Sequence, residues 1–130
     1  MITSLAKLFL VLGTANTMFA VVLGAFGAHA LKSRISIDMM NVYQTGIQYH
    51  FYHALGLIVV GIIAFHIPQS GLLKWSGWLM FAGIVLFSGS LYALALTNIR
   101  WLGAITPLGG TAFILSWLLL IIAVLKHKTG

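Results

Sequence analysis

The sequence lacks cysteine altogether and contains one acidic residue, Asp38. Without cysteine, the chain forms no disulfide, thiolate metal site or cysteine nucleophile. A single carboxylate excludes the paired acids of many hydrolases. It also argues against small antiporters that depend on a carboxylate inside the membrane. Charged residues make up 6% of the chain, whereas soluble domains contain about a quarter. The composition therefore indicates an integral membrane protein.

Long apolar runs take the place of the missing charges, since 61% of the residues are hydrophobic. The runs without a charged residue cover 8–31, 39–73, 75–99 and 101–125. Each is long enough to cross the hydrocarbon core, which requires about 20 apolar residues. The sequence predicts an all-α, four-transmembrane-helix bundle that forms one integral membrane domain over residues 1–130. The predicted spans are approximately 7–31, 46–66, 75–97 and 102–125.

The links between the runs predict the topology. Those at 67–74 and 98–101 are short, so neighbouring helices should be antiparallel. The longer link at 32–45 mixes apolar and charged residues, which suggests either a short helix lying at the interface or a polar loop. The apolar run after Lys7 ends in a motif like a signal-peptidase site, but it is too long for a signal peptide and is interpreted as the first span.

The net charge of +6 comes from basic residues scattered at the predicted helix ends, which does not suggest nucleic-acid binding. The termini and the 67–74 link together carry four Lys residues, against three Lys or Arg on the other side. The positive-inside rule then predicts that both termini are cytoplasmic, in a bacterial cytoplasmic membrane. The predicted environment is the lipid bilayer.

Small residues recur at helical spacing and predict where helices touch. In lipid, close backbone approach replaces the hydrophobic effect as the source of helix association. The predicted packing positions are Gly24, Ala28, Gly46 and Gly89. Gly24 in particular is expected to face another helix. Because every span has a small-residue face, the bundle should be compact, and we expect it to form a homo-oligomer.

Three histidines raise the question of a bound metal or haem. His50 and His53 share one face of the second span, and His29 ends the first span on the same side of the membrane. Such imidazoles could hold zinc or copper, or two of them could ligate haem. The favoured interpretation places His29 and His50 at the interface and gives His53 hydrogen bonds across helices. No metal or other cofactor is therefore predicted.

Polar and backbone-irregular residues of the four spans fall in one half of the bilayer. The predicted cluster joins His53, Ser90 or Tyr92, and Thr106, with His29 near its mouth. The segment with Pro107, Gly109 and Gly110 lies at the same depth and allows close backbone approach. An imidazole about 10 Å inside the helix end needs hydrogen-bonding partners. The cluster is then either a set of bonds that holds helices together or a small binding pocket open towards the 32–45 link.

Four segments of the chain together resemble one protein family. They are Leu23–His29 (LGAFGAH), Gln44–His53 (QTGIQYHFYH), Leu86–Tyr92 (LFSGSLY) and Ile105–Gly110 (ITPLGG). The chain resembles the small bacterial membrane proteins called domain of unknown function 423, which are related to the eukaryotic transmembrane protein 256. The resemblance implies a four-span membrane protein and brings no activity or substrate with it.

The histidines match this family unevenly. His29 and His53 stand at family motif positions, whereas His50 stands where relatives often have Gln, and Ser116-Trp117 stands where Gly-Trp is common. A position that accepts Gln is a poor metal ligand, so the departure weakens a paired-histidine metal site.

The sequence identifies no catalytic residues and no small-molecule ligand. It favours a structural, interaction or lipid-associated helix bundle that is not an enzyme. A small-solute channel or permease is one alternative, and a metal- or haem-binding membrane protein is the other.

Overall fold

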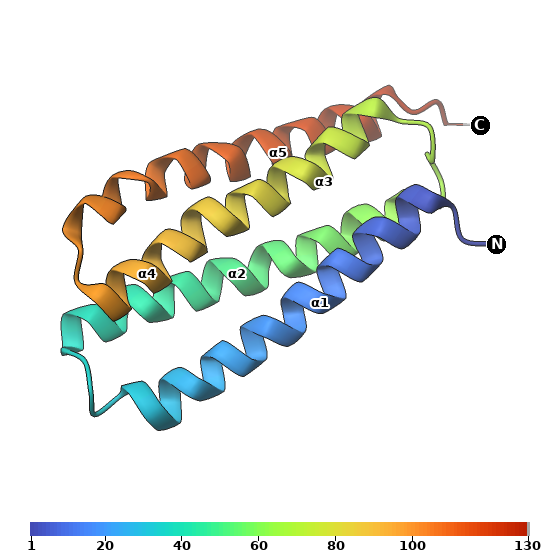
Figure 1. Ribbon diagram of the computed structural model, residues 1–130. Helices are drawn as coiled ribbons and strands as arrows, with labels where there is room; N and C mark the ends of the chain where they lie inside the picture. The colour runs from blue at the N-terminus through green and yellow to red at the C-terminus, as the bar shows by residue number, and fades with distance from the viewer. Residues whose placement is uncertain (130) are drawn as a thin grey trace.

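The computed structural model describes residues 1–129, which form a bundle of four long helical segments without strands (Figure 1). The first segment is α1 (Ser4–Phe26) and its π-helical extension η1 (Gly27–Leu31), and the second is α2 (Ile37–Ile63). The third comprises α3 (Gly71–Gly83), the π-helical η2 (Ile84–Ser88) and α4 (Gly89–Thr97). The fourth comprises the 3-10 turn η3 (Arg100–Ala104) and α5 (Thr106–Lys126). Each segment has 27 or 28 residues and is apolar enough to cross a membrane, which confirms the predicted fold class.

The helices succeed one another across the bundle in chain order (Figure 1). α1 packs along α2, which in turn packs against α3, η2 and α4, and α5 packs against α3 and η2. Both termini lie at one end of the bundle, because four antiparallel spans return the chain to the side on which it began. The second and third segments, which lie between the first and the fourth, bury a larger share of their residues than those two do.

Neither alternative for the 32–45 link, a separate short helix or a polar loop, describes its whole length, because only residues 32–36 form the link and α2 already begins at Ile37. The Ser36 hydroxyl caps it by accepting a hydrogen bond from the Met39 amide at 3.1 Å. Asp38 lies in the first turn, where the helix dipole favours a negative charge. The midpoint of α2 is consequently residue 50, whereas the midpoint of the predicted span 46–66 is residue 56. This shift moves His50 from the membrane interface to the middle of its helix.

The predicted packing glycines differ in what surrounds them. A Cβ at Gly46 would lie 2.9 Å from the Tyr92 ring, so α2 and α4 approach closely there. A Cβ at Gly24 would meet only Ile47, at 3.7 Å, and one at Gly89 would meet nothing within 4 Å. Ala28 is exposed. Gly24 therefore faces α2 at ordinary contact distance and without close backbone approach, whereas the expectation that Ala28 and Gly89 are packing positions is corrected.

The residues of α1 that pack closely against α2 lie on a different stripe of the helix from the predicted positions Gly24 and Ala28. Its buried members are Ala6, Phe9, Gly13 and Ala20, and the buried Gly27 of η1 continues it at heptad spacing. A Cβ at Gly13 would lie 2.7 Å from the Ile58 amide nitrogen, and one at Gly27 would collide with the Tyr43 ring. Gly24 and Ala28 flank this stripe, and that is why they keep free space.

Candidate functional site

A chain of hydrogen bonds crosses three helices through His50, whose side chain is 5% exposed. Its Nδ1 lies 2.8 Å from the Tyr92 hydroxyl of α4. Its Nε2 lies 3.0 Å from Oδ1 of Asn16 on α1. The Asn16 side-chain amide in turn donates to the Leu12 carbonyl at 2.8 Å. The chain therefore connects α4, α2 and α1 near the middle of the bundle.

The direction of each bond in this chain follows from its last member. The Leu12 carbonyl only accepts, so the Asn16 nitrogen donates to it and Oδ1 faces His50. His50 must then donate through Nε2, and in the neutral imidazole, the form that burial in an apolar interior favours, Nδ1 accepts the Tyr92 hydroxyl proton. The geometry therefore places a proton on Nε2 of His50.

His53 has the opposite arrangement. Its Nδ1 donates to the Tyr49 carbonyl at 2.8 Å, and its Nε2 accepts from the Trp117 indole nitrogen of α5 at 3.0 Å. The ring also stacks on Phe113, with centroids 3.4 Å apart and planes within 7°. An indole N–H only donates and a carbonyl only accepts, so His53 is neutral with its proton on Nδ1. A protonated His53 would lose its bond to Trp117.

Serine hydroxyls and the Tyr43 hydroxyl, which donates to the Leu23 carbonyl of α1, make the remaining hydrogen bonds between helices. Ser90 of α4 and Thr106 of α5 lie 2.7 Å apart, and Ser88 donates to the Gly46 carbonyl of α2 at 2.7 Å. Ser76 of α3 donates to the Ser116 carbonyl of α5, also at 2.7 Å. Within residues 1–129, every buried side-chain nitrogen and oxygen has a hydrogen-bonding partner. The polar interior thus consists of paired groups.

The structure divides the predicted cluster into separate bonds. Tyr92 joins His50, Ser90 joins Thr106, and His53 joins Trp117. The hydroxyls expected as partners of His53 were therefore assigned wrongly, although its side-chain partner does come from another helix. The reason is the early start of α2, which brings His50 to the depth of Tyr92.

The other predicted site residues lie at the edges of this interior. His29 is exposed on η1, and Pro107 is exposed in the first turn of α5. Gly109 is buried against the backbone of Phe87, and a Cβ at Gly110 would make ordinary contact with the Phe87 ring at 3.8 Å. Close backbone approach at this segment was expected, and its partner is the π-helical η2.

Sequence reasoning missed Asn16 as a partner of His50 and Trp117 as a partner of His53. One signal could have corrected the depth of His50: Ser36 followed by Asp38 is an N-terminal helix signature, and it moves the midpoint of the second span to residue 50.

The histidines are not gathered as a metal site. The described part of the chain has no group of three or more His or acidic side chains placed to hold a metal ion. Both ring nitrogens of His50 and of His53 are engaged by protein groups. A metal bound to either ring would have to displace one of these partners.

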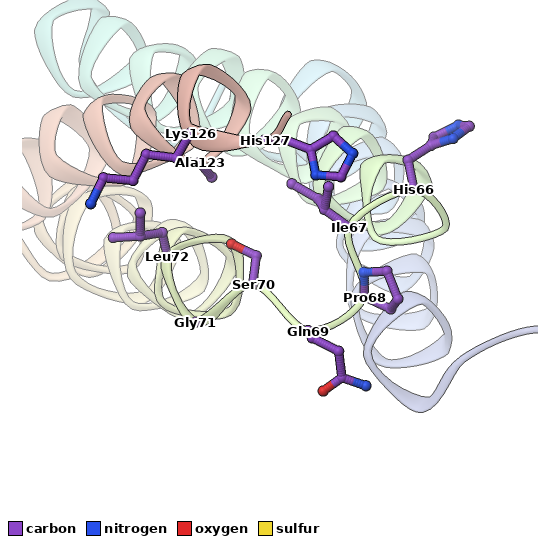
Figure 2. A pocket seen from close by; sticks show the side chains of 10 residues that line it. All are labelled: His66, Ile67, Pro68, Gln69, Ser70, Gly71, Leu72, Ala123, Lys126 and His127. Carbon is purple, nitrogen blue, oxygen red and sulfur yellow. The ribbon is translucent and has the colours of Figure 1, made fainter. Parts of the chain in front are cut away.

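Two surface cavities contain polar groups. One, of about 400 Å³, lies between the α2–α3 link and the end of α5, at the end of the bundle with the termini (Figure 2). His66, Gln69, Ser70 and His127 are among the polar residues that line it (Figure 2). The second, of about 290 Å³, lies between α1 and α2 towards the 32–36 link. None of the predicted cluster residues His53, Ser90, Tyr92 and Thr106 lines the second cavity.

Comparison with known proteins places the chain among bacterial membrane proteins. The family model described as protein of unknown function (DUF423) matches residues 23–110. The chain is 55% identical over 121 residues to the UPF0382 membrane protein YwdK of Bacillus subtilis, covering 93% of this chain and 98% of that protein. It is 52% identical over 120 residues to the UPF0382 membrane protein SERP0230 of Staphylococcus epidermidis, covering 92% and 97%.

No solved structure matches the chain significantly. The matched region contains all four segments that carry the family resemblance, from Leu23 to Gly110. Since the family model covers more than half of the chain and the relatives align over nearly all of it, the chain belongs to the DUF423 family of membrane proteins of unknown function.

Proposed function

We propose that this protein is a structural component of the bacterial cytoplasmic membrane: a helix bundle that associates with other membrane molecules and catalyses no reaction. In this proposal the outer faces of the bundle bind neighbours in the bilayer, including further copies of the chain. Both termini are proposed to lie in the cytoplasm, on the basis of the four-to-three distribution of basic residues.

The observation that carries the proposal is the pairing of the interior polar groups. A solute pathway or catalytic centre needs polar atoms that are free to bind a substrate. Here His50, His53 and the buried serines use their side-chain atoms on other helices or on backbone carbonyls. Bonds of this kind stabilise membrane helix contacts by about 0.6 kcal/mol each. Their arrangement supports a role in holding the bundle together.

The faces available for association are broad and apolar. On α1 the exposed residues include Met18, Phe19 and Val22, and on α5 they include Ile114 and Leu118. Because α1 and α5 form the outer edges of the bundle (Figure 1), these faces meet lipid or a neighbouring protein.

The proposal is tested by reconstituting the purified protein into liposomes. Uptake of small solutes is followed by light scattering, and proton entry by a pH-sensitive dye trapped inside. We expect rates equal to those of protein-free liposomes, with a known channel as the positive control. Uptake above the protein-free rate that is lost in His50→Leu would overturn the structural role and favour the permease alternative. A visible absorption band in the purified protein would favour the haem alternative.

A further inference from the structure

Two glutamines of α2 have no partner within the described chain. Gln44 and Gln48 are exposed. The α2 side chains that form hydrogen bonds within residues 1–129 are Tyr43, Thr45, His50 and His53. Asn41 and the hydroxyls of Tyr49 and Tyr52 also face outwards without a hydrogen bond in residues 1–129, but of these polar groups only the two glutamines border the same cavity.

Their depth makes this unusual. Gln48 is two residues from the midpoint of α2, or about 3 Å along the axis, and Gln44 is six residues away, or about 9 Å. The hydrocarbon core extends about 15 Å to either side of its centre. Both amides therefore lie at hydrocarbon depth, where lipid tails offer neither donors nor acceptors.

The two amides line a groove rather than a flat face. The cavity of about 290 Å³ between α1 and α2 is bordered by Gly24 and Ala28 on one side and by Gln44, Ile47 and Gln48 on the other. We call this surface the glutamine groove. A Cβ at Gly24 would meet only Ile47, at 3.7 Å, so the α1 wall leaves room for another helix to approach.

We propose that the glutamine groove is the interface with a second copy of this chain, in which the amides of the two copies pair with each other. This inference rests on the structural role proposed above and names the surface that performs it. An amide carries both donors and an acceptor, so the same face on two copies is self-complementary. This is the requirement of a two-fold interface.

Membrane insertion sets which residues meet. Two copies inserted in the same direction are related by an axis along the membrane normal, so residues at equal depth face each other. Gln48 of one copy then meets Gln48 of the other. None of the residues that line the groove is charged, so an anionic lipid headgroup would find no counter-charge there. The amide of a second copy can instead supply both the donors and the acceptor that Gln44 and Gln48 need.

The absence of native cysteine provides a direct test. Gln48→Cys introduces the only thiol, and oxidation in native membranes should give covalent dimers. Ile114→Cys is the matched control, because Ile114 is 71% exposed and lies one residue from the midpoint of the fourth segment, Arg100–Lys126. We expect most of the Gln48→Cys protein to become dimer and most of the Ile114→Cys protein to remain monomer. Equal yields at the two positions, or no dimer at position 48, would overturn the interface.

Two further variants separate association from folding. Gln44→Leu with Gln48→Leu should raise the dimer dissociation constant by about eightfold or more, as expected for the loss of two or more membrane hydrogen bonds. Gly24→Leu, added to Gln48→Cys, should block the cross-link by filling the groove. Both variants should unfold in detergent at the temperature of the parent protein. Dimers that persist in both would reject the groove.

These results are independent of the liposome test. A failed cross-link with no solute uptake would reject this interface and leave the structural role with another partner. Solute uptake would reject the structural role whatever the cross-link yields.

Discussion

Gly109→Ala tests the closest backbone approach found in the bundle. The N-terminal part of α5 presses against η2 at this point. A Cβ on Gly109 would lie 2.7 Å from both Cα and Cβ of Phe87 and closer still to its amide nitrogen. Two of these atoms belong to the backbone, so no rotation of a side chain can relieve the clash. The adjacent Gly110 is a natural control, because its Cβ would lie 3.8 Å from the Phe87 ring.

The magnitude follows from two opposing effects. Replacing Gly by Ala inside a helix favours folding by up to about 1 kcal/mol, and both substitutions gain this equally. Overpacking at Gly109 costs typically about 1–3 kcal/mol. The propensity gain cancels when the variants are compared, so Gly109→Ala should be less stable than Gly110→Ala by about 1–3 kcal/mol. Gly110→Ala itself should equal or exceed the parent protein in stability.

The measurement is reversible unfolding in mixed micelles with increasing denaturing detergent, followed by fluorescence of the four tryptophans. Both variants and the parent protein are measured at the same micelle composition. Equal midpoints for Gly109→Ala and Gly110→Ala would show that α5 does not pack on the Phe87 backbone. That result would refute the reasoning.

Three other outcomes are expected from the paired histidines. His50→Leu removes the bonds to Asn16 and Tyr92 and should lower the free energy of unfolding by about 1 kcal/mol; an unchanged unfolding midpoint would contradict the three-helix chain. Trp117→Phe keeps a ring but removes the donor to His53, so a smaller loss of about 0.6 kcal/mol is expected in the same assay, and a gain in stability would argue against that bond. In ¹⁵N NMR spectra of the protein in lipid, His50 should carry its proton on Nε2 and His53 on Nδ1. The same tautomer at both positions would disprove the assigned bond directions.

The number and type of elements follow from the sequence alone. Charge is too costly in hydrocarbon to be placed freely, so Lys7, Lys74 and Arg100 limit where helices can cross. Backbone groups in lipid must pair within the segment, so each apolar run becomes a helix. Nearby residues also determine where α2 begins, because Ser36 caps the helix and Asp38 lies in its first turn. A helix that begins at this cap has His50 at its middle, so the depth of His50 is also encoded locally.

Which residues meet across helices depended on the tertiary structure. The relative rotation and shift of two apolar helices are set by side-chain fit along their whole length, and no single residue reveals them. Gly24 and Gly13 are equivalent as sequence letters, yet only Gly13 faces the α2 backbone. In the same way, Asn16 pairs with His50 and Trp117 with His53 only because α1 and α5 present these faces to α2. The sequence determines that buried imidazoles need partners, and the packing of the helices decides which side chains provide them.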